Sequence, residues 1–302
     1  MTEYGAPDHV ATAPLPARHP PGPGGWMVAL DLDGTVLDDH HRVPAAVQAA
    51  IADTRACGVR VVIVTARAPV AARHVLGGIG PVDAVICLGG AQMLRRDASG
   101  LWLADPDLPP DTVPSGAVAG VVRAARALSL PLAVYAGEGL FADRLEEMLT
   151  EELQITGMTG AEADLLALDR PVLKMLAIAP PGREGDLLRL RAEAEGALSC
   201  VLSHPRYLEI MRQGVRKGRA LARLRDHWQV DRAHCVAMGD SENDLSMFAE
   251  AGLPIAMGNA TPEVQAAARF VTASHRQAGV AVALNRLIAG YWTSPAPGQL
   301  LR

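Results

Sequence analysis

Apolar and polar positions follow an α/β rhythm over the first third of this chain. Short apolar runs of strand length end in turns, and segments with helical periodicity follow them. Continuous apolar strands that alternate with helices are typical of a parallel sheet covered on both faces. The pattern predicts strands at 26–32, 59–66 and 83–90 and helices at 43–58 and 69–78.

The rhythm changes between Gly90 and Pro205. Short strands and helices mix there without regular alternation, and the loops are rich in Pro, Gly and Asp. We therefore expect a separate α+β domain inserted into the α/β domain. The pattern predicts strands at 101–105, 131–136, 172–179 and 198–204 and helices near 115–128, 141–153 and 183–196.

The first rhythm resumes after the insert and continues almost to the carboxyl terminus. It predicts helices at 214–228, 243–251, from Pro262 and at 279–290, and strands at 234–240, 253–258 and 269–273. The expected domains are a disordered Pro-rich tail at 1–24, a core at 25–89 and 206–291, an inserted domain at 90–205 and a loose tail at 292–302.

Composition narrows the class of protein. The 302 residues are 49% hydrophobic, which is ample for a sizeable core. A net charge of −5 without a long basic run argues against nucleic-acid binding, and no apolar run approaches the length of a membrane span. The scattered cysteines, without a CxxC pair, and the lack of a signal-peptide pattern favour reduced thiols in the cytoplasm. The oligomeric state stays unknown.

Polar residues close several of the apolar strands. Asp31 and Asp33 end the first strand, Thr65 ends the second, and Asp240 ends "HCVAMGD". In open parallel sheets this edge is where ligands bind, so we expect these side chains to converge on one crevice. Lys217, one of only two lysines in the chain, lies near the start of a helix and is expected to reach the same place.

This set of residues suits phosphoryl chemistry. Hard oxygen ligands match Mg²⁺, and the chain has no His/Cys cluster for zinc. A carboxylate beside Mg²⁺ can attack phosphorus, a second carboxylate can move protons, and a lysine with a hydroxyl can hold phosphate oxygens. Asp31 and Asp33 do not belong to a calcium-binding loop of the D-x-D-x-D-G type. Val36 stands where that loop needs glycine, and Arg42 stands where it needs glutamate.

The chain resembles the haloacid dehalogenase-like (HAD) hydrolase superfamily, in particular its Cof-type, type IIB-capped sugar-phosphatase branch. Four motifs carry the resemblance in order: "DLDGT" (31–35), "VVIVTAR" (61–67), "GVRKGRAL" (214–221) and "MGDSENDLSMF" (238–248). "VLKML" in the insert and "GNATPEV" (258–264) are similar to the family as well. The resemblance spans about residues 26–290 and implies a Rossmann-like parallel-sheet core with an inserted α+β (type IIB) cap domain.

The resemblance also implies roles for individual residues. Asp31 would be the nucleophile, Asp33 the general acid/base, and Thr65 and Lys217 the residues that hold the transferring phosphoryl group. Mg²⁺ would be bound by Asp31, by the backbone carbonyl of Asp33 and by Asp240. Asp244 would support the cation through a water molecule or through the residues that bind it. The residues expected to bind substrate are Gly34, Ala66, Arg67, Lys174 and Asn243.

Some of these positions have a second interpretation. Arg67 fits a substrate anion or a core carboxylate equally, and Lys174, in an apolar strand of the insert, either faces the substrate or lies on a solvated face. Asn243 would contact phosphate or Lys217. Two motifs also depart from the branch: T-G-R is Thr65-Ala66-Arg67 here, and N-G-A is Gly89-Gly90-Ala91. The second departure removes an amide side chain where the cap begins.

The function expected from motifs and residues is a cytoplasmic, Mg²⁺-dependent phosphatase of small phosphorylated metabolites, with sugar phosphates as the expected class. A phosphomutase of the phosphomannomutase type is the alternative among enzymes. A non-catalytic phosphometabolite-binding protein is the alternative outside enzymes, although the intact Asp31 and Asp33 argue against it.

Overall fold

The computed structural model describes residues 24–292. The chain divides into two compact units. Of the described residues, the first unit contains 24–64, 75–85 and 217–292, and the second contains 65–74 and 86–216. The two expected tails, 1–24 and 292–302, lie almost wholly outside the described residues.

The larger sheet has eight strands in the order β14-β13-β12-β1-β2-β3-β4-β5. Pairing is parallel from β14 through β2, while β4 and β5 form an antiparallel hairpin at one edge. The strands are β1 (Met27–Asp31), β2 (Arg60–Val64), β3 (Ala84–Cys87), β4 (Gln92–Arg96), β5 (Trp102–Ala104), β12 (Cys235–Gly239), β13 (Leu253–Ala256) and β14 (Phe270–Val271). Every residue of β1, β3 and β12 is buried, as expected for central parallel strands.

The strand order reverses at β1. The sheet grows from β1 through β2 and β3 in one direction, and through β12, β13 and β14 in the other. Ligands of open α/β sheets bind at such a reversal, outside the carboxyl ends of the strands. Asp31 is the last residue of β1 and Asp240 directly follows β12, so both carboxylates are placed at this point.

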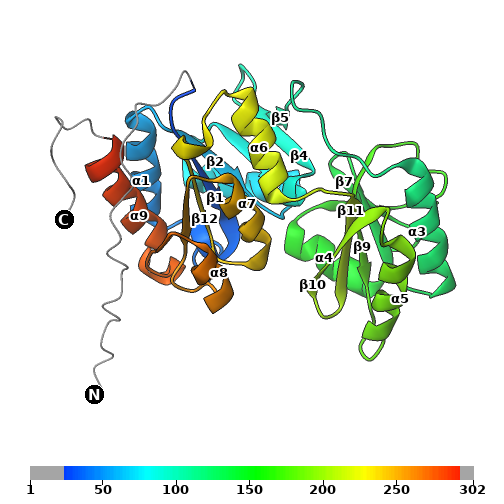
Figure 1. The fold of residues 1–302 in the computed structure, drawn as a ribbon. Helices are drawn as coiled ribbons and strands as arrows, with labels where there is room; N and C mark the ends of the chain where they lie inside the picture. The colour runs from blue at the N-terminus through cyan, green and yellow to red at the C-terminus, as the bar shows by residue number, and fades with distance from the viewer. Residues whose placement is uncertain (1–23, 293–302) are drawn as a thin grey trace. The chain divides into compact units, whose positions relative to one another are not determined.

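Helices of the first unit pack in neighbouring pairs (Figure 1): α1 lies beside α9, and α6 lies beside α7. α1 buries Val47, Ala50, Ile51 and Thr54, which recur at helical spacing on one face. The helices along this part of the chain are α1 (Ala45–Ala56), α2 (Pro69–Ile79), α6 (Lys217–His227), α7 (Leu245–Glu250), α8 (Pro262–Ala267) and α9 (Gly279–Leu287). The parallel-sheet α/β core is thereby confirmed.

The second unit is built on a six-stranded sheet in the order β10-β11-β9-β6-β7-β8. Its pairs are antiparallel except β7 with β8. Its strands are β6 (Leu132–Ala136), β7 (Gly139–Ala142), β8 (Thr159–Glu162), β9 (Val172–Ile178), β10 (Leu198–His204) and β11 (Tyr207–Arg212). Its helices are α3 (Ser115–Ala127), α4 (Glu147–Thr156) and α5 (Glu184–Ala194).

The helices of this unit divide between the two faces of its sheet. Met175 and Ala177 of β9 pack with residues of α3 and α5 in one core cluster. Leu176 and Ile178, which point to the opposite face, pack with Leu149 of α4 in another. The α+β character expected of the insert is confirmed.

Several elements of the second unit differ from the expectation. The helix expected at 141–153 is instead strand β7 followed by α4, and the strands β4, β7, β8 and β11 were not predicted. β8 is exposed along its whole length and carries no apolar pattern that could reveal it. The second unit also extends to Arg216 rather than 205, because β11 pairs with both β9 and β10.

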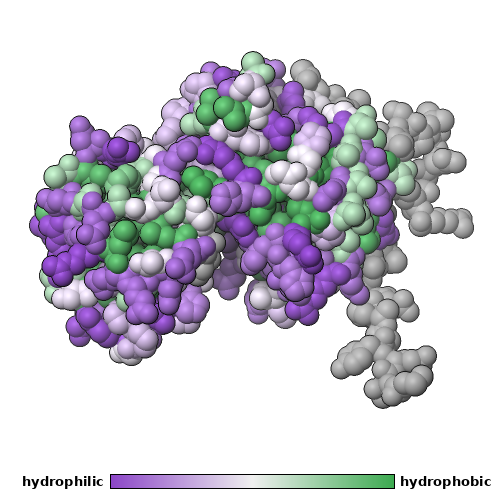
Figure 2. All heavy atoms as spheres, turned by 180° about the vertical axis from the view of Figure 1, so that it is seen from behind, coloured by the Kyte–Doolittle hydropathy of each residue, from purple (hydrophilic) through white to green (hydrophobic). Residues whose placement is uncertain are grey.

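The surface shows no single dominant feature on the face drawn in Figure 2, where polar and apolar residues are interspersed. Within the described residues, no helix combines the length and hydropathy that a membrane crossing requires. The four cysteines are free thiols: Cys87 and Cys235 are buried, Cys200 is half-buried and Cys57 is exposed.

Candidate active site

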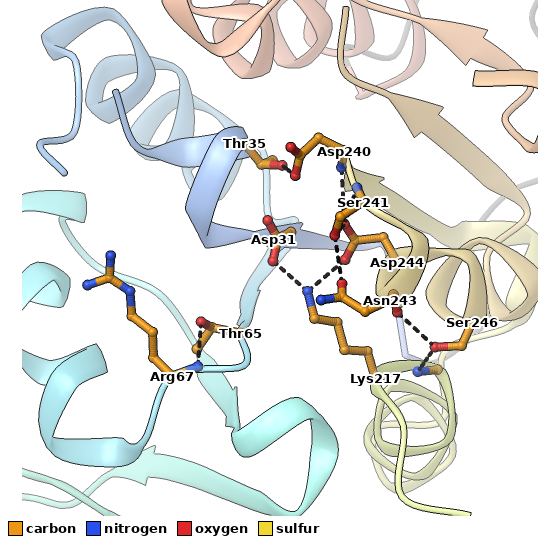
Figure 3. Close-up of polar contacts among 11 residues, drawn as sticks. Asp31, Thr35, Thr65, Arg67, Lys217, Asp240, Ser241, Asn243, Asp244 and Ser246 are labelled. Carbon is orange, nitrogen blue, oxygen red and sulfur yellow. Dashed lines mark hydrogen bonds and ion pairs between the residues drawn. The ribbon is translucent and has the colours of Figure 1, made fainter. Parts of the chain in front are cut away.

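Asp31 and Lys217 form the centre of the site (Figure 3). Asp31 ends β1 and is 4% exposed, and Lys217 begins α6 and is 2% exposed. The Lys217 ammonium contacts Asp31 Oδ1 at 2.6 Å and Asp244 Oδ1 at 2.7 Å. The lysine therefore bridges two buried carboxylates.

The chain turns sharply after Asp31, in the segment Leu32–Val36. Gly34 adopts a φ of +75°, which favours glycine, and a Cβ there would lie 2.3 Å from Asp240 Oδ2. Glycine is therefore required at this position on both counts. The turn leaves the Asp33 carboxylate half exposed, 3.6 Å from His41 Nδ1, while the Thr35 hydroxyl donates to Asp240 Oδ1 at 3.4 Å.

Asp244 is wholly buried and organises the loop after β12. Its Oδ2 accepts hydrogen bonds from the backbone N–H groups of Asp240 and Ser241 at 3.0 and 3.1 Å, and Ser241 and Asp244 form a capping box. Its Oδ1 meanwhile contacts Lys217. Asp244 thus fixes both the lysine and the backbone that carries Asp240.

Ser246, which lies in α7, forms a hydrogen bond that holds the start of α6 in place. Its Oγ accepts a hydrogen bond from the backbone N–H of Gly218 at 3.0 Å and donates to the carbonyl of Asn243 at 3.2 Å. Because Gly218 directly follows Lys217, this contact helps to place the lysine. The role of Ser246 was missed, since its apolar neighbours make the segment read as simple core packing.

Burial and mutual repulsion set the electrostatics of the carboxylates. Burial raises the pKa of Asp31 to about 7, with further repulsion from Asp244 and Asp240 and an opposing attraction from Lys217. The pKa of Asp240 is also raised, first by burial and then by Asp244. Burial opposes the charge of Lys217, but attraction by Asp31 and Asp244 outweighs it and raises the pKa of the lysine.

The carboxylates fit a divalent cation. One oxygen each from Asp31, Asp240 and Asp244 lie within 4.8 Å of one another. The Lys217 ammonium contacts Asp31 and Asp244, so one positive charge stands against three carboxylates. Repulsion from Asp244 adds to the effect of burial in raising the pKa of Asp31 and of Asp240. Hard oxygen donors with excess negative charge suit Mg²⁺.

Thr65 directly follows Val64, the residue of β2 that is in register with Asp31. The buried Thr65 hydroxyl accepts a hydrogen bond from the backbone N–H of Arg67 at 3.1 Å. Ala66 between them is exposed and Arg67 is half-buried. The strand register thus places Thr65 at the expected edge of the sheet, and its role in binding phosphate stays a prediction.

The departure at Gly89 has a conformational explanation. Gly89 adopts a φ of +61°, a left-handed conformation that glycine takes freely and asparagine takes more readily than most residues. Its N–H donates to the carbonyl of Thr65 at 3.0 Å. The backbone at this position therefore favours glycine, and the side-chain amide of the branch's asparagine is absent here.

Lys174 lies in the second unit and is 5% exposed, so the interpretation that it lies on a solvated face is wrong. Its ammonium contacts Glu209 Oε1 at 3.0 Å and lies 5.1 Å from the ring centroid of Tyr135. Tyr135 in turn donates to Glu152 at 3.2 Å. Asn243, by contrast, is exposed and accepts from the Ser241 hydroxyl at 2.9 Å. Substrate contacts of Lys174 and Asn243 stay predictions.

Fold and site together define the class: an α/β phosphomonoester hydrolase with a carboxylate–lysine centre at the reversal of a parallel sheet and a second α+β unit inserted in the chain. The family model described as haloacid dehalogenase-like hydrolase matches residues 28–284. The chain belongs to this family, which confirms the resemblance seen in the four motifs.

Relatives of known name agree with this assignment. The HMP-PP phosphatase of Citrobacter koseri is 29% identical over 243 residues, covering 79% of this chain and 86% of the relative. The structure of TM0651 from Thermotoga maritima matches with a TM-score of 0.77 at 26% identity, covering 87% of this chain and 97% of that one. The HAD subclass IIB sugar phosphatase BT4131 shares the fold, with a TM-score of 0.72 at 20% identity and coverage of 87% and 98%.

Proposed function

We propose that this enzyme is a Mg²⁺-dependent phosphatase of small phosphorylated metabolites, sugar phosphates in particular, that forms an aspartyl-phosphate on Asp31. The observation that carries the proposal is the contact of the Lys217 ammonium with the buried Asp31 carboxylate at 2.6 Å. This contact supports Asp31 as the nucleophile, because it holds one carboxylate at the place where ligands of such sheets bind. The cytoplasm stays the predicted compartment.

In the first step, an Asp31 oxygen attacks phosphorus and the bond from phosphorus to the ester oxygen breaks. Asp33, whose carboxylate is half exposed, supplies the proton that the leaving alkoxide needs. Lys217, with Thr65, holds the phosphoryl oxygens as charge moves onto them. The product alcohol leaves and Asp31 carries the phosphoryl group.

In the second step, Asp33 accepts a proton from water as the water oxygen attacks phosphorus. The bond from phosphorus to Asp31 then breaks, and inorganic phosphate leaves. Asp31, the Asp33 carbonyl and Asp240 would hold Mg²⁺, which would neutralise charge between the anionic nucleophile and the anionic phosphate. Asp244 supports the cation indirectly, through Lys217 and the backbone of Asp240.

Substrate recognition is proposed for residues around this centre and in the second unit: Gly34, Ala66, Arg67, Lys174 and Asn243. The name of the Citrobacter koseri relative supports a small phosphorylated substrate. Because the Lys174 charge is already paired with Glu209, a substrate would have to share that ion pair rather than meet a lone cation.

A panel of phosphorylated metabolites, screened for phosphate release with Mg²⁺ present, tests the proposed function. Release of stoichiometric phosphate from one class of substrate is the expected result. Conversion of a sugar phosphate to its isomer without phosphate release would instead establish a mutase. Tight binding of a metabolite with no turnover would establish a binding protein.

We expect removal of the metal to abolish activity, and Asp240→Asn to weaken Mg²⁺ binding. Because Asp240 is itself a proposed ligand, its loss should raise the Mg²⁺ dissociation constant by at least about 100-fold, the upper end of what loss of a residue that only orients a ligand costs. Titration calorimetry with MgCl₂ measures the constant, and EDTA followed by Mg²⁺ addition tests reversibility. Because burial, and then repulsion from Asp244, already raise the pKa of Asp240, the metal-free variant should be no less stable to heat than the wild type.

Asp33→Asn should slow turnover about 10²- to 10⁴-fold while phosphorylation of Asp31 persists. The reason is that p-nitrophenolate leaves without a proton, whereas water still needs a base. Intact-mass measurement after mixing with p-nitrophenyl phosphate should therefore show a phosphorylated protein. Asp38→Asn is the matched control, since Asp38 lies in the same loop and accepts from the backbone of His40 and Arg42. A normal rate for Asp33→Asn would remove this residue from the mechanism.

A further inference from the structure

Asn259 lies in the loop between β13 and α8, within the segment "GNATPEV". Its side-chain nitrogen donates to the carbonyl of Gly34 at 2.9 Å and to Asp240 Oδ2 at 3.1 Å. Its side-chain oxygen accepts from the backbone N–H of His275 at 2.9 Å. Because a backbone N–H can only donate, this third bond defines which end of the amide is oxygen.

These three hydrogen bonds join segments that are far apart in the sequence. The Gly34 carbonyl belongs to the turn that follows the nucleophile, and it lies 225 residues from Asn259. The second partner, Asp240, is one of the clustered carboxylates. One exposed amide therefore connects the turn after β1 with the loop after β12.

The Asp240 carboxylate is held by one donor on each oxygen. Thr35 donates to Oδ1 at 3.4 Å, and Asn259 donates to Oδ2 at the shorter distance of 3.1 Å. Each oxygen accepts at more than one lone pair, so both stay able to bind a cation while the donors fix the rotation of the carboxylate. Loss of Asn259 would remove the shorter of these two contacts.

A second link reinforces the position of the third segment. The His275 ring contacts Asp39 Oδ1 at 2.8 Å, and the Arg276 guanidinium contacts Asp39 Oδ2 at 2.7 Å. Asp39 lies a few residues after the turn that contains Gly34. The segment at 275–276 is thereby tied both to Asn259 and to the chain that follows the nucleophile.

We propose that Asn259 is a positioning residue that holds the Asp240 carboxylate and the Gly34 turn in the arrangement that binds Mg²⁺. The proposal rests on the proposed function, since it assigns the support of that same cation site. Outer-shell partners of this kind orient the ligands that bind a metal, and their loss lowers metal affinity.

The test compares Asn259→Ala and Asn259→Leu with the matched control Gln265→Ala. Leucine keeps the branched shape of asparagine and loses all three hydrogen bonds. The Gln265 amide donates to the carbonyls of Gly258 and Ala260 on either side of Asn259, so the control loosens the same loop without touching Asp240. Titration calorimetry of each full-length protein with MgCl₂ gives the dissociation constant, and thermal unfolding in EDTA gives stability.

We expect both Asn259 variants to raise the Mg²⁺ dissociation constant about tenfold, with Gln265→Ala close to the wild type. Turnover of the Asn259 variants should recover when Mg²⁺ is raised to saturate them. Because the side chain is exposed, both variants should fold. Wild-type Mg²⁺ affinity in both Asn259 variants, or equal weakening in Gln265→Ala, would overturn the positioning role alone. Lack of Mg²⁺ binding by the wild type would overturn the proposed function as well.

Discussion

Asp31→Asn should abolish phosphatase turnover, with a fall of about 10⁴-fold or more, as expected when the nucleophile of a covalent mechanism is lost. An amide has almost the same shape as the carboxylate and its oxygen can still accept from Lys217, so the site should keep its geometry. It lacks the negative oxygen that attacks phosphorus. Phosphate release under saturating Mg²⁺ measures the loss, and intact mass should show no phosphorylated protein.

The stability of Asp31→Asn separates a chemical effect from a folding effect. Burial raises the pKa of Asp31 to about 7 in the metal-free protein, from an ordinary value of 3.8. The folded state therefore retains a proton that the unfolded chain loses, and the contribution of this group to stability declines as pH rises from about 4 to about 7. Asparagine does not titrate, so its contribution to stability does not decline over this pH range. In EDTA, the variant should gain thermal stability relative to the wild type across this window.

A clear loss of thermal stability in Asp31→Asn at neutral pH would contradict this account, because it would mean that the ionised carboxylate stabilises the metal-free fold. Retained turnover would contradict the mechanism itself. The two measurements are independent, so an inactive and stable variant supports Asp31 as the nucleophile.

Lys217→Met should lower turnover by about 10³-fold, because the group that holds the phosphoryl oxygens is lost. It should also destabilise the metal-free protein by about 3–5 kcal/mol at neutral pH, since removal of one partner leaves buried charge without compensation. Asp31 and Asp244 both contact the ammonium, at 2.6 and 2.7 Å. Chemical denaturation in EDTA measures the free energy of unfolding.

The pH dependence of Lys217→Met distinguishes this cause from poor packing. Without the lysine, the attraction that opposes the raised pKa of Asp31 disappears, so the folded state should hold its protons still more strongly. Stability should then be largest at acidic pH and fall more steeply than in the wild type as pH rises toward neutrality. A loss of stability that is equal at all pH values would indicate a packing defect instead.

Arg55→Met serves as the control for Lys217→Met. Arg55 contacts Asp83 Oδ1 at 2.7 Å in the same unit, away from the carboxylate cluster, and both partners are partly exposed. The pair has a second hydrogen bond, from Arg55 Nε to Asp83 Oδ2 at 3.0 Å, so its loss should cost about 1 kcal/mol, still well below the cost at Lys217. We expect turnover of this variant to match the wild type.

The central strands and their polar ends could be predicted because each signal is local. The apolar run before Asp31 forms β1, and "HCVAMGD" places Asp240 just past β12. Parallel pairing then brings these ends to one edge without knowledge of any distant contact. The rarity of lysine also pointed to Lys217, which is almost completely buried beside Asp31.

Other parts depend on contacts that no local pattern reveals. β8 pairs with β7 although its residues are all exposed, and β11 is defined by its hairpin with β10. The double role of Asp244, toward Lys217 and toward the backbone of Asp240, follows from its complete burial, which the sequence does not show. Asn259 was part of a segment seen to be similar to the family, yet its contact with Gly34 arises only in the folded chain.

The position of β1 between β2 and β12 has a consequence for biosynthesis. Asp31 is translated 186 residues before Lys217, the cation that accompanies it in the folded protein. At about 5–20 residues per second, β1 would wait about 10–40 s on the ribosome before β12 could cover its second edge. During that interval the nascent chain presents an unpaired apolar strand edge, the kind of surface that invites aggregation. We therefore expect nascent chains that stop short of β12 to depend on chaperones. The site around Asp31 can form only late in synthesis, after Lys217 and β12 have been translated.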